Sequence, residues 1–191
     1  MWRHHPGTTS DPTVAEKPTF AAGTTMAKLS SAGTIRIGTK FDQPLFGQVG
    51  LDGKPVGFDV EMGKLIAAKL GIAADKIEWS ETVSANREPF IEQGKVDIVI
   101  ATYTINDKRK QVVSFAGPYY EAGQALMVNK DNTSITKPED VAGKKVCSVT
   151  GSTRPRRSWT STRPSSCRQP LTPLALSRCA TSRSKRSPRT T

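Results

Sequence analysis

The sequence lacks the features of several protein classes, namely membrane proteins, zinc-binding proteins and disulfide-rich proteins. It contains no run of about 18 apolar residues, so no segment of it reads as a membrane-spanning helix. Its three cysteines, Cys147, Cys167 and Cys179, match neither a zinc-ligand pattern nor a dense disulfide framework. His4 and His5 are the only histidines, and both lie in a predicted linker. We therefore expect no metal site, no cofactor and no enzymatic activity.

Acidic residues are absent from the C-terminal tail. Residues 154–191 contain nine Arg and one Lys, which account for +10 of the total net charge of +11. Residues 1–153 hold 18 basic and 17 acidic side chains, a balance of +1. The tail is also rich in Ser, Thr and Pro and has no helical or strand period, so we expect it to be disordered. The high pI therefore does not indicate a polyanion partner for the rest of the chain.

Residues 1–23 are rich in Thr, Pro, Gly and Ala, and we expect them to form a disordered linker. Between this linker and the tail, helical and strand patterns alternate along the chain. We predict helices at 24–31, 59–70 and 86–94, with Thr24 or Thr25 capping the first. We expect the second helix to bury Val60, Met62, Leu65, Ile66 and Leu70. Strands are predicted at 34–39, 76–80, 96–101, 124–130 and 145–149. This order favours a mostly parallel α/β sheet, whose ligands bind beyond the carboxyl ends of the strands.

Several separated motifs then identify a family. They are GTIRIGTKFDQPLFG, VSANREPFIEQGKVDIVIATYTINDKRK and FAGPYY, and the similarity covers about residues 22–153. This part of the chain resembles family 3 of the bacterial extracellular solute-binding proteins, which bind polar amino acids. It is most similar to the glutamate-binding members from high-GC Gram-positive bacteria. The resemblance implies a type II periplasmic-binding-protein fold, in which two α/β lobes trap a ligand between them.

The resemblance also implies a division of the chain. We expect lobe 1 at 24–125, the start of a truncated lobe 2 at 126–153, and the tail at 154–191. GC-rich codons can be chosen for the tail so that a neighbouring reading frame encodes PAKAILDIDQAVV and VEAVTTDN. Both stretches resemble what the family carries downstream of GST. We therefore interpret the tail as a frameshift product. The alternative is a genuine disordered basic tail, and the DNA sequence decides between them.

An amino-acid ligand offers a carboxylate and an ammonium group, and a guanidinium is the natural bidentate partner of a carboxylate. Arg109 stands where the family places such an arginine. Thr102 and Thr104 match positions that bind the carboxylate and ammonium groups. Ser152, and less surely Thr153, match a hydroxyl that the second lobe contributes. On composition alone, a Lys/Arg run at a helix start is more often a solvated face.

The resemblance also implies a second group of residues, which would bind the side chain of the ligand. Ser84 and Arg87 match the loop that contacts the side chain in glutamate and aspartate binders, and Lys40 matches a position that is basic there. Two converging cations would favour a second carboxylate. The alternative is that Arg87 pairs with Glu81 or Glu88, and Lys40 with Asp42, on the surface.

We therefore expect a substrate-binding component of an ABC importer that captures glutamate or aspartate, works as a monomer and partners the permease membrane subunits. The family acts outside the cytoplasmic membrane, often through a lipid anchor, although no signal peptide or lipidation cysteine is visible here. Two other functions stay open. One is nucleic-acid binding by the basic tail, which the charge distribution disfavours, and the other is a dehydratase like a few relatives of this fold. A third possibility is an inactive product of a pseudogene.

Overall fold

The computed structural model describes residues 10–16, 18–123 and 125–153. The chain divides into two units, Met1–Tyr103 and Thr104–Thr191, which are taken separately below. Neither unit, as far as it is described, has a helix with the length and apolar character needed to cross a membrane.

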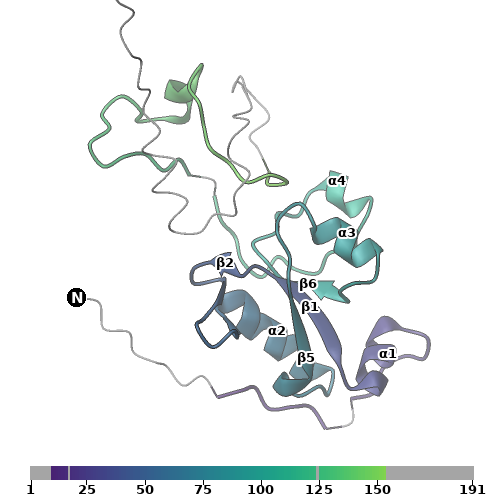
Figure 1. The fold of residues 1–191 in the computed structure, drawn as a ribbon. Coiled ribbons are helices and arrows are strands. Elements are labelled where there is room, and N and C mark those ends of the chain that lie inside the picture. The colour runs from purple at the N-terminus through teal and green to yellow at the C-terminus, as the bar shows by residue number, and fades with distance from the viewer. Residues whose placement is uncertain (1–9, 17, 124, 154–191) are drawn as a thin grey trace, which may run out of the picture. The chain divides into compact units, whose positions relative to one another are not determined.

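A three-stranded parallel sheet forms the centre of the first unit (Figure 1). Its strands are β1 (Ile35–Thr39), β5 (Ile77–Glu81) and β6 (Ile98–Val99), in the order β5-β1-β6. Both neighbours of β1 run parallel to it, with Ile37 opposite Trp79 on one side and Ile98 on the other. The sequence prediction of a parallel α/β sheet is confirmed, although β6 is shorter than the predicted strand at 96–101.

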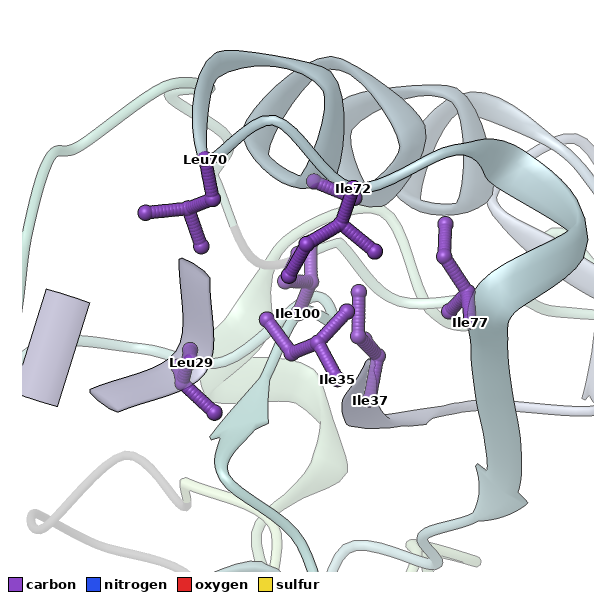
Figure 2. Close-up of a cluster of buried hydrophobic side chains, with 8 residues drawn as sticks. Leu29, Ile35, Ile37, Leu70, Ile72, Ile77 and Ile100 are labelled. Carbon is purple, nitrogen blue, oxygen red and sulfur yellow. The ribbon is translucent and has the colours of Figure 1, made fainter. Parts of the chain in front are cut away.

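The core of this unit forms where strand side chains meet the end of a helix. Ile35 and Ile37 of β1 are 1% and 0% exposed, because the middle strand is covered on both faces. Figure 2 shows these side chains gathered with those of Ile77 and Ile100 and with Leu70 and Ile72, which follow the long helix. Burial of this kind contributes about 1.5–3 kcal/mol for each large aliphatic side chain.

The long helix α2 (Phe58–Lys69) packs on the sheet through small residues rather than large ones. Gly63, Ala67 and Ala68 are buried, whereas Leu65 and Ile66 are 47% and 38% exposed. The prediction that Leu65 and Ile66 face the core is therefore wrong. The physical reason is that the Trp79 ring fills the space next to the buried face of the helix. A Cβ at Gly63 would lie 2.6 Å from this ring, so only a small residue fits on that face.

The segment between β1 and α2, which we predicted as a loop, contains a second sheet. Strands β2 (Asp42–Gln43), β3 (Gly47–Val49) and β4 (Pro55–Val56) pair antiparallel in sequence order. The turn between β2 and β3 includes Leu45, whose φ of 71° is left-handed and unusual for a residue with a side chain. Strands of two or three residues have too little periodicity to be recognised in a sequence.

Helix α1 (Thr25–Ala32) lies before β1, and the 3-10 helix η1 (Ala74–Lys76) lies before β5. The predicted cap is confirmed: the Thr24 hydroxyl accepts a hydrogen bond from the Ala27 N–H at 3.2 Å. Part of the predicted linker contacts α2, since the Ala15 N–H donates to the Ala68 carbonyl at 2.9 Å. Helix α3 (Arg87–Glu92) joins β5 to β6 and falls within the predicted helix at 86–94.

The second unit, as described to Thr153, contains helix α4 (Asp107–Lys110) and the 3-10 helix η2 (Pro138–Val141). The strands predicted at 124–130 and 145–149 are not formed at 125–130 or 145–149. An extended segment becomes a strand only when its N–H and C=O groups find a neighbouring strand. These segments have none among the residues described, and Met127 is 80% exposed. The prediction for residues 154–191 lies outside the described residues.

Candidate functional site

The loops that leave the parallel sheet at its carboxyl end start close together. The Thr82 N–H donates to the Thr39 carbonyl at 2.7 Å, and the Ile100 N–H donates to the Gly38 carbonyl at 2.9 Å. Gly38 permits this approach, because a Cβ there would collide with the Thr82 hydroxyl. All three strands therefore deliver their following loops to the edge at which open α/β sheets bind ligands.

Lys40 is the first residue after β1, and it is buried. Its ammonium lies 2.7 Å from Asp42 Oδ1, and the two side chains are 8% and 11% exposed. Pairing of Lys40 with Asp42 was the alternative to a role of Lys40 in ligand binding. The pair is present, but it is buried rather than on the surface. A buried pair of this kind persists only where both charges are well placed, since each loses its hydration.

Arg87 begins α3 and is only 3% exposed. Its Nη1 donates to the Thr102 carbonyl at 3.3 Å, and its guanidinium lies 5.0 Å from the centre of the Tyr103 ring. Stacking on an aromatic face suits the flat, weakly hydrated guanidinium and holds it in one orientation. Arg87 is thus a fixed positive group near the carboxyl end of the parallel sheet, where open α/β sheets bind ligands.

Thr102 links two of the loops. Its hydroxyl donates to Gln43 Oε1 at 2.8 Å, while its carbonyl accepts from Arg87. The residues that follow β1, start α3 and follow β6 are therefore tied together by side-chain contacts. Ser84, from the loop after β5, is buried at 7% exposure.

The second unit places Arg109 in a cage of oxygen atoms. Arg109 is 9% exposed, and its guanidinium donates to the Thr104 carbonyl at 2.8 Å and to the Gly151 carbonyl at 3.0 Å. The Thr153 hydroxyl lies 3.4 Å from Nη1. The Asn106 side chain caps α4 by accepting from the Arg109 N–H at 3.0 Å, which orients this residue. The guanidinium fork thus meets oxygen acceptors from two loops, as it would meet the two oxygens of a carboxylate.

The predicted residues divide between the two units. Within the first unit, a hydrogen bond brings Arg87 and Thr102 together, and an ion pair joins Lys40 to Asp42. Within the second, Thr104 contacts Arg109 through its carbonyl, and its side chain is exposed. Ser152 is exposed, next to two residues that contact Arg109.

Sequence reasoning missed Gln43 and Tyr103, and it treated Asp42 only as a possible surface partner. The signal for Asp42 was its closeness in sequence to Lys40, although the two residues lie on either side of the break between β1 and β2. Tyr103 and Gln43 carried no comparable signal. Among residues 10–16, 18–123 and 125–153, no three His, Cys, Asp or Glu side chains are grouped to hold a metal ion.

Comparisons with known proteins identify the family of this chain. The model of bacterial extracellular solute-binding proteins, family 3, matches residues 35–182. The glutamate-binding protein GluB of Corynebacterium efficiens is 42% identical over 126 residues, which are 63% of this chain and 43% of that protein. The glutamine-binding protein of Geobacillus stearothermophilus is 36% identical over 148 residues, 76% of this chain and 56% of that protein. This chain spans about half the length of these relatives.

Solved structures show the same fold. The crystal structure of AncCDT-1, an ancestral amino acid-binding protein and precursor of cyclohexadienyl dehydratase, superposes with a TM-score of 0.58 at 35% identity. The superposition covers 62% of this chain and 52% of that one. The periplasmic-binding-protein fold predicted from the sequence is therefore confirmed. The family match extends past Thr153, and the frameshift interpretation of the tail stays a prediction.

Proposed function

Because this chain belongs to family 3 of the bacterial extracellular solute-binding proteins, we propose that it captures glutamate or aspartate for an ABC importer. The relatives support an amino-acid ligand in general, since they are named for glutamate and for glutamine. The choice of an acidic ligand rests on the residues that this chain places at the edge of its sheet.

One observation carries the proposal: Arg87 is buried at the carboxyl end of the sheet and held by the Thr102 carbonyl and the Tyr103 ring. Its orientation is therefore set before any ligand arrives. A fixed guanidinium binds a carboxylate more strongly than a mobile one, because little side-chain entropy is lost on binding. We assign the side-chain carboxylate of the ligand to Arg87, with Ser84 as a neighbouring hydroxyl donor.

Arg109 is assigned to the carboxylate that every amino acid carries. Its two terminal nitrogens donate to two separate oxygen atoms, those of Thr104 and Gly151, and a guanidinium fork of this kind can bind both oxygens of a carboxylate. A ligand carboxylate that takes this place has to replace at least one of these acceptors. We assign the ligand ammonium to the backbone and hydroxyl oxygens of Thr102 and Thr104, and a further hydroxyl contact to Ser152.

No covalent step is needed for this function. In the mechanism that the family membership implies, the ligand binds the first lobe and the second lobe closes over it. Outside the cytoplasmic membrane, the closed form then docks on the permease subunits of the importer, which lie in the membrane. The charged side chains of the site act only by binding, since the proposed ligand leaves chemically unchanged.

Isothermal titration calorimetry of the 191-residue chain tests the proposal with glutamate, aspartate, glutamine and arginine. We expect glutamate or aspartate to bind with a lower Kd than arginine, because fixed cations repel a cationic side chain. Binding is expected to be weak, since the chain spans only about half the length of its relatives. Equal or tighter binding of arginine would contradict the assignment of Arg87, and no binding of any of the four would contradict the function.

A further inference from the structure

We propose that Asp42 is a specificity-determining residue of this site. By neutralising the charge of Lys40, it sets how strongly the site prefers a carboxylate side chain to an amide side chain. The inference rests on the proposed function and deepens it. It assigns a ligand class: amino acids with an amide side chain, such as glutamine, as well as those with a carboxylate.

The Lys40–Asp42 pair is built into the backbone of the first unit. Asp42 lies on β2, opposite Gln48 of β3, and the Val49 N–H donates to the Phe41 carbonyl at 3.0 Å. Gly47 allows β3 to pass next to Lys40, because a Cβ at Gly47 would collide with the Lys40 carbonyl. The loop after β1 is therefore held against β3, and Asp42 cannot easily move away from Lys40.

The charge of the pair follows from this placement. The ammonium and carboxylate are 2.7 Å apart and largely shielded from water, so they act toward a ligand as a dipole rather than as a cation. The attraction of a dipole for a distant carboxylate falls off faster than that of a single charge. Lys40 then adds little preference for glutamate over glutamine, although its position suggested the opposite.

Asp42→Asn isolates this effect, because the amide keeps the shape of the carboxylate and removes its charge. An uncompensated Lys40 should attract the side-chain carboxylate of glutamate. The Kd ratio of glutamine to glutamate is expected to rise about tenfold, as for a unit charge in a partly screened site. Lys40→Gln should lower the same ratio, since it leaves the Asp42 carboxylate facing the ligand.

The experiment is calorimetry of the full chain and its variants with glutamate and glutamine, after circular dichroism has shown that each variant is folded. In Lys40→Gln/Asp42→Asn, both charges are absent, and the ratio should lie between those of the two single variants. This double variant keeps the test decisive if Asp42→Asn alone does not fold: with no net charge at the pair its ratio should lie close to that of wild type, and a ratio no higher than that of Lys40→Gln would contradict the inference. Asp75→Asn is the matched control: it removes an exposed carboxylate that lies 3.8 Å from the Lys76 ammonium, and it should leave the ratio unchanged.

The outcomes separate the two proposals. If wild type binds both ligands and Asp42→Asn leaves the ratio within twofold, the role of Asp42 is wrong and the proposed function stands. If Asp75→Asn raises the ratio as much as Asp42→Asn does, the effect belongs to net charge, and the inference is also wrong. If wild type binds no amino acid, the proposed function fails and takes this inference with it.

Discussion

Arg36 and Asp97 form a two-point ion pair that joins the beginnings of β1 and β6. Arg36 Nη2 lies 2.7 Å from Asp97 Oδ1, and Nε lies 3.1 Å from Oδ2. The Arg36 N–H also donates to Oδ2, at 2.9 Å. The pair sits at the amino end of the parallel sheet, whereas the candidate ligand-binding residues of this unit follow the carboxyl ends. It is therefore a structural contact, and it can be tested without affecting the site.

This pair predicts a pH dependence of stability. Partial burial tends to raise the pKa of Asp97, but the hydrogen bonds and charge of Arg36 outweigh it and hold that pKa below its usual value. A carboxyl group with a depressed folded-state pKa stabilises the fold above its unfolded pKa of about 4. That stabilisation is lost as the pH falls through the lower, folded-state pKa. Wild type should therefore exceed Asp97→Asn in free energy of unfolding at pH 7, and the difference should shrink below about pH 4.

Urea unfolding at a series of pH values between 2 and 8 measures this difference. Asp75→Asn serves as the control, because Asp75 is exposed and 3.8 Å from its partner Lys76. A difference between wild type and Asp97→Asn that is as large at pH 2.5 as at pH 7 would show that the ionised carboxylate contributes nothing.

The close packing of α2 on β5 predicts that Gly63→Ala is destabilising. In an exposed helix position this substitution would gain about 0.5–1 kcal/mol from helix propensity. Here the new methyl group would meet the Trp79 ring at 2.6 Å and Ile37 Cδ1 at 3.3 Å. Overpacking of a rigid core costs about 1–3 kcal/mol, so the steric term wins. Gly123→Ala, where a Cβ meets no atom within 4 Å, is the control in thermal unfolding.

The stacking of Arg87 on Tyr103 predicts a measurable coupling between the two side chains. A double-mutant cycle with Tyr103→Leu and Arg87→Met should give a coupling free energy of about 0.5–2 kcal/mol, the range for cation–π contacts. Tyr103→Phe keeps the ring face and should retain most of the coupling to Arg87. Additive effects of Tyr103→Leu and Arg87→Met on chemical unfolding would mean that the ring does not hold the guanidinium.

The assigned roles of the two arginines predict different losses of binding. Arg109→Lys replaces a fork with a single point charge, so Kd should rise about tenfold or more for glutamate and glutamine alike. Arg87→Lys should weaken glutamate more than glutamine, since only glutamate has a second carboxylate. Calorimetry with both ligands distinguishes the two patterns. An Arg109→Lys variant that loses glutamate selectively would reverse the assignment.

The sequence predicted most of the first unit, because its elements are long enough to show their period. Ile35 and Ile37 alternate within β1, and Thr24 caps α1 through a local hydrogen bond that the sequence alone specifies. The face of α2 could not be predicted from hydrophobicity. Gly63 is buried because Trp79, sixteen positions along the chain, occupies the space above it, and such long-range packing leaves no local pattern.

The candidate site was predictable in part. Family resemblance selected Arg87 and Arg109, and their burial is unusual for a charged side chain, which makes both positions worth testing. The partners of these arginines could not be predicted, since carbonyl groups carry no sequence signature. In the second unit, the prediction of strands was wrong for a related reason at 125–130 and 145–149. A strand depends on a neighbour that a local apolar pattern cannot supply.

Amide chemical-shift mapping by NMR tests the central claim most directly, because it locates the ligand on the folded chain. On titration with glutamate, we expect the largest shifts at Lys40, Ser84, Arg87 and Thr102, which follow or lie near the carboxyl ends of the parallel strands. The amides of Arg36 and Asp97, at the opposite end, should not move. Shifts centred on Arg36 and Asp97, or no shifts at saturating glutamate, would contradict the account.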